Sequence, residues 1–408
     1  MNTPNIRFKG FSCDWEKRKL GDIVGSVIGG GTPKTSIDGY WDGDIPWIQS
    51  SNVLENEMFD FEIPKKITQS GLDKSAAKLV PANSIAVVTH VGVGKLVFVP
   101  FAYTTSQDFT SLAELKTDHQ FTCYALYKRL QDDLHIVQGS AIKGITKDDL
   151  LTKEIMVPTK DEQCKVGKYF RNLDNLITLH QRKCDSLKQV KKYMLQKLFP
   201  KQGEKVPEIR FAGFTGDWEQ RKLGSIGETY TGLSGKTKED FGHGDARFVT
   251  YMNVFSNPVA DKDKVEAVEI DYSQNEVQYG DVFFTTSSET PEEVGMSSVW
   301  LESTENTYLN SFCFGYRPKT IINPYFMAYV LRSDEVRAKI IFLAQGISRY
   351  NISKNKVMEI EIPFPDIKEQ KKIGAYFSNL DNLITIHQRK SDSLKEIKKF
   401  MLQNMFPQ

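Results

Sequence analysis

The sequence contains two copies of one unit, and this duplication constrains the fold more than any other feature. Residues 6–23 match residues 209–226 at 13 of 18 positions, with a constant offset of 203. Residues 162–200 match residues 369–407 at 28 of 39 positions, with an offset of 207. The chain therefore consists of two repeats, each with a similar opening and a similar closing block.

The middle of each repeat has diverged. The clearest remaining match there pairs Gln138-Gly139 and Ile145 with Gln345-Gly346 and Ile352, again at an offset of 207. Segments that stay alike after duplication share one role or one type of partner, whereas segments that diverge are free to acquire two specificities. We therefore interpret the closing blocks as scaffold and the middles as the parts that discriminate.

Each closing block is predicted to form one long helix. Residues 162–198 contain no Pro and one Gly, and apolar residues recur at heptad spacing. A Phe-Pro pair, Phe199-Pro200 or Phe406-Pro407, ends each block. The stripe positions expected to pair the helices are Val166, Phe170, Leu173, Ile177, His180, Leu187 and Met194, and Ile373, Phe377, Leu380, Ile384, His387, Leu394 and Met401.

The two helices are expected to pair with each other, because a single exposed helix with an apolar stripe is not stable alone. We predict an antiparallel intramolecular coiled coil, since a short linker leads from the first helix into the second repeat. The result is a closed, pseudo-two-fold ring with adjacent termini. His180 and His387 occupy equivalent stripe positions, where they either bind a metal or fix the register of the pair. No second ligand type lies nearby, so we favour the register and predict no metal.

The remaining residues predict two α+β domains. Ser84–Thr89 and Val282–Thr285 are typical of buried strands, and Phe326–Leu331 is typical of a helix. The fold class is α+β, with two globular domains joined by two long antiparallel helices. The predicted organisation is a globular domain at 1–158, a helix at 159–200, a linker at 201–208, a globular domain at 209–365 and a helix at 366–408.

Composition and cysteine spacing narrow the class of protein. The chain begins with polar residues and contains no apolar run of the roughly 18 residues that a membrane helix needs, so we expect a cytoplasmic location. The five cysteines are odd in number and never spaced C-x-x-C, which argues for free thiols rather than disulfides or zinc ligands. Residues 232–237 resemble a phosphate loop but have Tyr230 where that motif requires Gly. We expect no catalysis by this chain.

Charge is distributed unevenly along the sequence. The net charge is −2 over residues 1–159, +7 over 160–201, −7 over 202–365 and +3 over 366–408. Proteins that bind nucleic acid usually carry a basic footprint. Any DNA binding by the globular parts must therefore depend on local clusters, with other subunits supplying much of the phosphate contact.

The doubled pattern of F-x-G-F-x-x-D-W-E-x-x-K-L-G openings and E-Q-x-K-[IV]-x-x-Y-F-x-x-L-D-x-L-I helices resembles the specificity (S) subunit of type I restriction-modification systems. The resemblance covers essentially the whole chain. It implies that each divergent middle is a target-recognition domain that reads one half of a bipartite, asymmetric sequence in double-stranded DNA. It also implies that the stripe-bearing helices set the spacing of the two domains and dock two methyltransferase (M) subunits, which restriction (R) subunits join.

By the same resemblance the chain is a non-catalytic subunit of a type I restriction endonuclease and adenine-N6 DNA methyltransferase complex. S-adenosylmethionine belongs to the M subunit, while ATP and magnesium belong to the R subunit. No cofactor is expected in this chain.

The family motifs assign no base-reading residues, so the candidates rest on residue type and on their place in loops after buried strands or before the last strand. Arg pairs well with guanine and Asn with adenine. The candidates are Thr89, His90, Lys95 and Lys143 in the first repeat, and Ser287, Ser288, Arg349, Tyr350 and Asn351 in the second. Trp15 and Trp218 lie at equivalent positions with apolar neighbours, which favours core packing over a platform for a flipped base.

Two other functions remain open from the sequence. The first is a non-catalytic coiled-coil scaffold that bridges two protein partners, which the acidic globular parts favour. The second is a self-contained modification enzyme, which would need a methyl-donor loop and a complete catalytic tetrapeptide that the sequence lacks.

Overall fold

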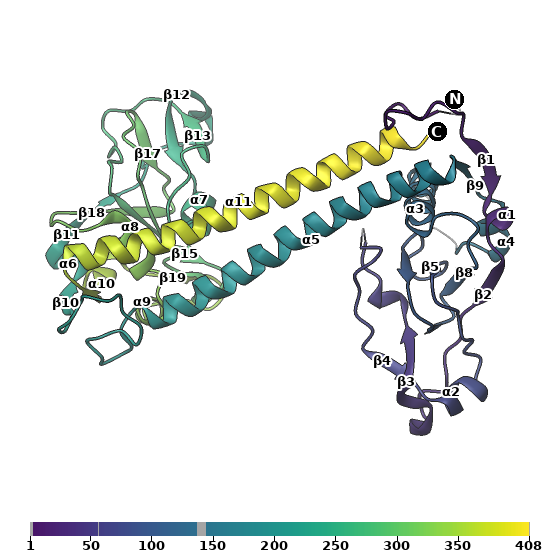
Figure 1. The fold of residues 1–408 in the computed structure, drawn as a ribbon. Helices are drawn as coiled ribbons and strands as arrows, with labels where there is room; N and C mark the ends of the chain where they lie inside the picture. Colours follow the sequence, from purple (N-terminus) through teal and green to yellow (C-terminus); the bar gives the residue numbers. More distant parts are fainter. Residues whose placement is uncertain (1–2, 56, 137–143, 408) are drawn as a thin grey trace. The chain divides into compact units, whose positions relative to one another are not determined.

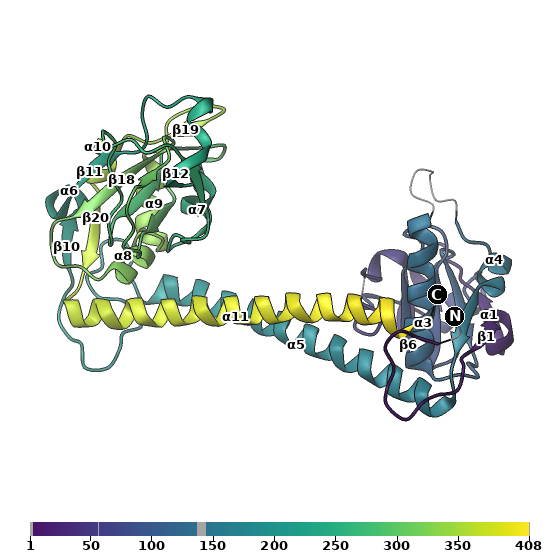
Figure 2. The same cartoon turned by 90° about the horizontal axis from the view of Figure 1, so that it is seen from above.

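The computed structural model describes residues 3–55, 57–136 and 144–407. The chain divides into two compact units, one formed by Met1–Gln181 with Gln388–Gln408 and the other by Arg182–His387. Each unit combines the globular part of one repeat with a portion of both long helices, α5 (Lys160–Lys197) and α11 (Ile367–Met405) (Figures 1 and 2).

Unit 1 is built on an antiparallel four-stranded sheet in the order β2-β8-β5-β6. The central strand β5 spans Ser84–Val88 and is buried along its whole length, as a continuous run of small and branched residues between two covered faces should be. The predicted strand at Ser84–Thr89 is confirmed apart from its last residue. The partner strands are β2 (Ser26–Gly29), β8 (Phe109–Ala113) and β6 (Leu96–Val99).

A three-stranded sheet, β4-β3-β7, and an antiparallel pair, β1-β9, complete the strands of unit 1. These strands are β1 (Glu16–Lys19), β3 (Trp41–Ile48), β4 (Lys65–Ile67), β7 (Thr104–Thr105) and β9 (Glu154–Val157). The helices of its globular part are α1 (Leu20–Ile23), α2 (Gln69–Asp73), α3 (His119–Ile136) and α4 (Lys147–Thr152).

Unit 2 repeats this topology, with a four-stranded sheet β11-β18-β14-β16, a three-stranded sheet β13-β12-β17 and the pair β10-β20. The predicted strand Val282–Thr285 is confirmed as β14. The others are β10 (Glu219–Lys222), β11 (Gly227–Thr231), β12 (Phe241–Val249), β13 (Val265–Val268), β16 (Ser297–Val299), β17 (Thr307–Leu309), β18 (Cys313–Pro318) and β20 (Glu361–Phe364).

Unit 2 also contains elements that have no counterpart among the described residues of unit 1. A two-residue ladder joins β15 (Ser287–Ser288) to β19 (Tyr350–Asn351). Where unit 1 has the single helix α3, unit 2 has α8 (Pro324–Val330) followed by α9 (Asp334–Phe342). The predicted helix at Phe326–Leu331 lies in α8 and ends one residue earlier than expected. The remaining helices are α6 (Leu223–Ile226), α7 (Tyr251–Ser256) and α10 (Lys354–Met358).

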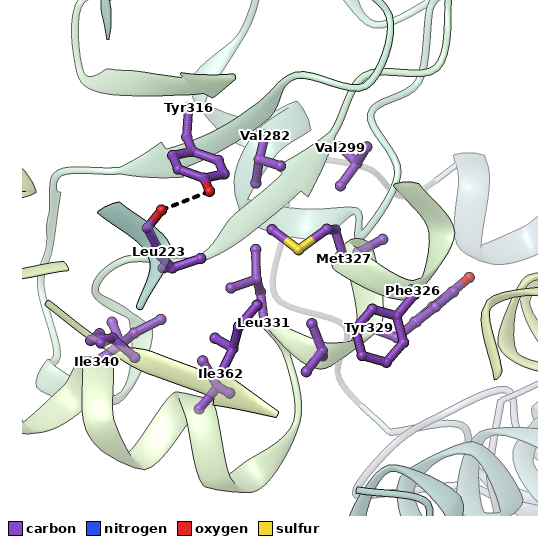
Figure 3. Packing of buried hydrophobic residues seen from close by; sticks show 14 of the residues in the cluster. Leu223, Val282, Val299, Tyr316, Phe326, Met327, Tyr329, Leu331, Ile340 and Ile362 are labelled. Atoms are coloured by element: carbon purple, nitrogen blue, oxygen red, sulfur yellow. Dashed lines mark hydrogen bonds between the residues drawn. The ribbon is translucent and has the colours of Figure 1, made fainter. Parts of the chain in front are cut away.

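The core of unit 2 lies between its four-stranded sheet and helices α8 and α9 (Figure 3). Val282 and Val299 from the sheet face Met327 and Leu331 from the helical side, and all four are fully buried. The hydroxyl of Tyr316 donates a hydrogen bond to the carbonyl oxygen of Leu223 at 2.9 Å, so this buried polar group is satisfied. The fold class predicted from the sequence, two α+β domains with two long helices, is confirmed.

Each globular part is closed by the end of a helix that belongs to the other repeat. In unit 1, Phe406 after α11 packs against Trp15, Phe121 and Phe170, with ring centroids 5.7 to 6.1 Å apart. Trp15 is 1% exposed, so the prediction of core packing is confirmed for this residue.

In unit 2, Phe199 after α5 fills the same place. Its ring lies 6.0 Å from the rings of Phe326 and Phe377 and 6.4 Å from that of Trp218. Trp218 is 2% exposed, which confirms core packing here as well. The same aromatic cluster therefore seals both units, and in each the sealing phenylalanine comes from a different repeat than the residues around it.

The two helices are antiparallel within each unit, as predicted from the connectivity. In unit 1 the ammonium of Lys398 pairs with Asp174, and the side chains of Ser391 and Lys395 approach Gln181. In unit 2 Lys191 pairs with Asp381, and the Cys184 thiol approaches the carbonyl oxygen of Ile384. In both units the contacts pair increasing residue numbers on α5 with decreasing residue numbers on α11, as antiparallel helices require. Supercoiling of the pair into a coiled coil stays a prediction.

The first and last described segments of the chain meet inside unit 1, where both views place them side by side (Figures 1 and 2). The backbone N–H of Ile6 donates to the carbonyl oxygen of Asn404 at 2.9 Å, and that of Ile209 donates to Lys197 at the same distance. The junction of the termini thus reproduces the passage from α5 into the second repeat. The adjacency of the termini predicted from the sequence is confirmed.

The openings of the two repeats are tied to the starts of the long helices. Arg7 forms two hydrogen bonds of 2.7 Å with the buried carboxylate of Glu162, and Arg210 forms two of 2.8 Å with Glu369. Both carboxylates lie in the first turn of their helix, where the helix dipole also favours negative charge. All five cysteines are free thiols. Among the described residues, no helix combines the length and apolar character needed to span a membrane.

Candidate functional site

The first cluster of candidates follows β5 in unit 1. Thr89 is 1% exposed, and its hydroxyl donates to the carbonyl oxygen of Asp108 at 3.0 Å. His90 is exposed, and its Nδ1 lies 3.3 Å from the Thr89 hydroxyl. Thr89 therefore holds the end of the strand, while His90 is the side chain presented to solvent.

Lys95 lies on the other side of the same turn, immediately before β6. It is half-buried, and its carbonyl oxygen accepts a hydrogen bond from the N–H of Val88 at 2.9 Å. The structure thus brings Thr89, His90 and Lys95 to one strand end. The fourth candidate, Lys143, lies outside the described residues, but the nearby N–H of Ile145 donates to the carbonyl oxygen of Thr89 at 2.7 Å.

Unit 2 contains the equivalent junction. The N–H of Ile352 donates to the carbonyl oxygen of Thr286 at 3.0 Å, as Ile145 does to Thr89 in unit 1. Next to this bond the β15–β19 ladder pairs Ser287 with Asn351 and Ser288 with Tyr350. All five candidates of the second repeat therefore lie together, at the place in the fold where Thr89, His90 and Lys95 of the first repeat lie.

The two serines of this cluster face the interior. Ser287 and Ser288 are 5% and 8% exposed. The guanidinium of Arg349 donates from Nε and Nη2 to the hydroxyl oxygen of Ser287, at 3.3 and 3.1 Å. The Ser288 hydroxyl donates to Glu293 at 3.3 Å. The serines therefore support the site, while Arg349 and Asn351 are exposed and Tyr350 is half-buried.

One neighbouring residue of this cluster was not predicted from the sequence. The Tyr251 hydroxyl donates to the carbonyl oxygen of Ser287 at 2.7 Å, and burial raises the pKa of this phenol. Tyr251 therefore acts as a neutral donor that holds β15. It begins α7, far from Ser287 in sequence, and no local pattern marks it.

The stripe residues of the long helices are covered within the chain. Buried members are Val166, Phe170, Leu173, Ile373, Phe377 and Leu380, and half-buried members are Ile177, His180, Leu187, Met194, Ile384, His387, Leu394 and Met401. None of the fourteen is exposed. Docking of a partner by these residues stays a prediction. Among the described residues, no group of three or more His, Cys, Asp or Glu side chains is arranged to hold a metal ion.

A second set of apolar helix residues lies outside the heptad stripe and is exposed. In unit 1 these residues are Leu176, Leu179, Ile397 and Phe400, which are 43 to 54% exposed. In unit 2 they are Leu383, Ile386, Val190 and Tyr193, which are 40 to 51% exposed. The members of the two sets correspond at the offset of 207. We call each set a helix flank. The signal was present in the sequence, because all four of these positions are apolar in both copies of the closing block.

The sequence matches a known family over most of its length. A sequence model described as the type I restriction modification DNA specificity domain matches residues 13–189 and again residues 215–396. The chain belongs to this family. The two matched segments contain every DNA-binding candidate and the start of each helix flank, and they follow the internal duplication.

Several curated relatives are also specificity subunits. The chain is 22% identical to the specificity subunit of the type I restriction enzyme MjaVIII of Methanocaldococcus jannaschii, over 95% of this chain and 90% of the relative. It is 24% identical to the MjaIX specificity subunit of the same organism, over 55% of this chain and 54% of the relative. The chain thus spans about half the length of one specificity subunit and nine-tenths of the other.

Solved structures share the fold at low sequence identity. The S subunit of a type I restriction-modification system from M. genitalium aligns with a TM-score of 0.59 and 16% identity, covering 100% of this chain and 99% of that one. A chain from a type I restriction-modification system studied for its complex assembly aligns with a TM-score of 0.54 and 15% identity, covering 95% and 96%. The duplicated α+β architecture is therefore shared with S subunits.

Proposed function

We propose that this chain is the non-catalytic subunit that gives a type I restriction-modification complex its DNA sequence specificity. The observation that carries the proposal is the contrast between the two repeats. The same strand-end junction presents His90 and Lys95 in unit 1 but Arg349 and Asn351 in unit 2, while the closing blocks stay identical at 28 of 39 positions. Two different readers on one scaffold suit a bipartite, asymmetric target in double-stranded DNA.

In this proposal each unit reads one half of the target, and the helices set the spacing between the half-sites. Exposed Arg and Asn side chains are well suited to contact guanine and adenine edges in the major groove. A helix of 38 residues is about 57 Å long at 1.5 Å per residue. That length suits half-sites separated by about one turn of DNA, roughly 34 Å.

The helix flanks are the proposed docking surfaces for two M subunits. Exposed apolar residues that form sets on a protein surface mark interaction sites. The equivalence of Leu176 with Leu383 and of Tyr193 with Phe400 supports one type of partner bound twice. R subunits would join this assembly. S-adenosylmethionine would bind to the M subunits and ATP with magnesium to the R subunits, with none in this chain.

A protein scaffold is the second candidate, because the globular segments have net charges of −2 and −7. A scaffold would not bind DNA. A specificity subunit would bind DNA with a steep salt dependence when its M subunits supply phosphate contacts. Binding assays with and without the M subunits, across a salt series, separate the two functions.

The deciding experiment is to map adenine methylation in the host genome with and without this gene, using single-molecule sequencing. We expect one bipartite motif to lose its methylation on deletion, which would reveal both half-sites and their spacing. If every methylated motif persists while the M and R subunits are expressed, this function is wrong and the scaffold is favoured.

A further inference from the structure

The segment from Gln345 to Asn351 in unit 2 forms a tight turn. The two residues exchange backbone hydrogen bonds of 2.9 and 2.8 Å, which close the base of the turn. Gly346 has a φ of +146°, and a Cβ at this position would lie 2.0 Å from the carbonyl oxygen of Arg349. Only glycine fits there. The β15–β19 ladder also anchors the turn, so the side chains of the turn are held in fixed positions.

Ile347 projects from this turn into solvent. It is 94% exposed, the highest fraction among the large apolar side chains of the described residues. Exposing an isoleucine gives up the stabilisation that burial would provide, and no described neighbour covers this one. A side chain that is open on all sides can be covered on both faces at once by a partner.

The neighbours of Ile347 indicate which partner this is. Arg349 is exposed, and its guanidinium is held by hydrogen bonds to the Ser287 hydroxyl. Asn351 is also exposed at the end of the turn. A cation and an amide in the same turn as an exposed apolar side chain match the phosphates and base edges that lie beside an apolar gap between stacked bases of DNA.

We propose that Ile347 inserts between two neighbouring base pairs of the half-site read by unit 2 and unstacks them as an apolar wedge. This inference rests on the proposed function. Insertion covers a side chain from two sides, whereas contact with a thymine methyl group in the major groove covers it from one. The near-complete exposure of Ile347 favours insertion.

The wedge belongs to one half-site only. At the offset of 207, the first repeat has Ser140 in place of Ile347. Ser140 lies outside the described residues, but a hydroxymethyl group is too small and too polar to replace a stacked base. Unstacking by a residue of this chain is therefore expected at the second half-site and not at the first.

The test uses the complete complex of this chain with its M subunits and duplexes that carry the mapped target. 2-Aminopurine, whose fluorescence rises when it is unstacked, is placed at each step of both half-sites in turn. In the wild-type complex, 2-aminopurine fluorescence should rise at one base step of the second half-site. The position of the methylated adenine is not counted in this comparison. Ile347→Ala should abolish that rise and weaken binding roughly 10-fold. It should leave the salt dependence unchanged, because no charge is lost.

Two further variants make the test specific. Ile347→Met should keep the rise, since methionine also serves as a wedge. Phe342→Ala removes another exposed apolar residue, 89% exposed and outside the turn, and should change nothing.

The wedge is refuted if the wild-type complex unstacks no base besides the methylated adenine. It is also refuted if replacing one thymine by uracil reproduces the whole effect of Ile347→Ala, because that result identifies a methyl contact. Both results leave DNA binding intact and so spare the proposed function. A complex that fails to bind the duplex at all would refute both.

Discussion

The ammonium group of Lys398 lies 2.6 Å from a carboxylate oxygen of Asp174, and both side chains are largely buried, at 8% and 13% exposure. The Tyr124 hydroxyl donates to the same carboxylate at 2.5 Å. Burial, with the nearby charge of Asp174, raises the pKa of Tyr124, so this phenol stays neutral. Unit 2 repeats the arrangement with Lys191, Asp381 and Tyr329, and its ion pair is also 2.6 Å long.

Removing the ammonium group should cost more in unit 1 than in unit 2. Lys398→Met leaves the carboxylate of Asp174 buried without its cationic partner, which we expect to destabilise unit 1 by about 3 kcal/mol. The Lys191 pair is more exposed, at 20% and 30%, so Lys191→Met should cost about 1 kcal/mol. Differential scanning calorimetry of both variants gives the comparison, each serving as the control for the other. Equal losses of stability in the two variants would show that burial does not determine how much each ion pair contributes. Adding Asp174→Asn to Lys398→Met should recover most of the loss.

The exchanged helix ends give a second prediction. Phe406→Ala and Phe199→Ala each remove a ring from an equivalent aromatic cluster, and each should destabilise its unit by about 3 to 5 kcal/mol. Each ring also holds the end of a long helix against its globular part, so either substitution should loosen the last turn of its helix. Hydrogen exchange over the ends of α11 and α5 measures this loss of protection, and unchanged protection in either variant would contradict it.

Buried thiols should report the opening of each unit. Burial raises the pKa of the Cys313 thiol in unit 2 to about 12, and it also raises that of Cys123 in unit 1. Only the thiolate reacts with alkylating reagents. At pH 8 we expect Cys13, which is exposed, to react in the folded protein, while Cys123 and Cys313 react only after unfolding. Mass spectrometry after timed iodoacetamide labelling gives the rate at each cysteine. Rapid labelling of Cys313 in the native protein would contradict its burial.

The same shift has a consequence for stability at high pH. The thiol of Cys313 ionises near 9.0 in the unfolded chain and near 12 in the folded one. Between these values the unfolded state binds fewer protons, so the free energy of unfolding falls as pH rises. One such group contributes at most about 1.4 kcal/mol per pH unit. Cys313→Ser, compared with the parent by urea denaturation at pH 8 and pH 10, should show a weaker decline if this thiol contributes.

The duplication made much of the architecture predictable. Two copies of a block with heptad spacing specify two helices, and the short linker specifies their direction, so α5, α11 and their antiparallel contacts followed from the sequence alone. Buried strands such as Val282–Thr285 were also predictable, since a short, continuous apolar run is expected to be a strand covered on both faces.

Features that depend on tertiary contacts were not predictable. Ser287 and Ser288 resemble a solvated loop, because nothing local shows that Asn351 and Tyr350 pair with them. The helix flanks were not predicted for a different reason. Heptad spacing marks the stripe, but it does not show whether another apolar residue on the helix, such as Leu176, is covered or exposed. Exposure in the folded chain is what distinguishes the stripe, which the chain itself covers, from the flank.

The contribution of Arg349 to DNA recognition should depend on the Ser287 hydroxyl that holds its guanidinium. Arg349→Ala is expected to cost about 1 to 3 kcal/mol at one base pair of the second half-site if the guanidinium reads a base. Uniform weakening across all sequences would instead identify a phosphate contact. Ser287→Ala keeps the guanidinium but removes the hydroxyl that receives Nε and Nη2, so it should give a smaller loss at the same base pair. Binding to a panel of single-base variants of the target, in the complex with the M subunits, measures both. His90→Ala is the matched control, and its effect should be confined to the first half-site.

The helix flanks predict how many M subunits each variant binds. Leu176→Glu places a charge in the flank of unit 1, and Leu383→Glu does the same in unit 2. Because both side chains are exposed, neither change should alter folding by more than about 0.5 kcal/mol. Each variant should weaken one docking site by roughly 30-fold, or about 2 kcal/mol, so that native mass spectrometry finds one M subunit where the parent binds two. The double variant should bind none.

Gln189→Glu is the matched control, because the equivalent residue of the second helix is already Glu396 and this exposed position is polar in both copies. Two M subunits on the double variant would exclude the flanks and place docking elsewhere on the chain.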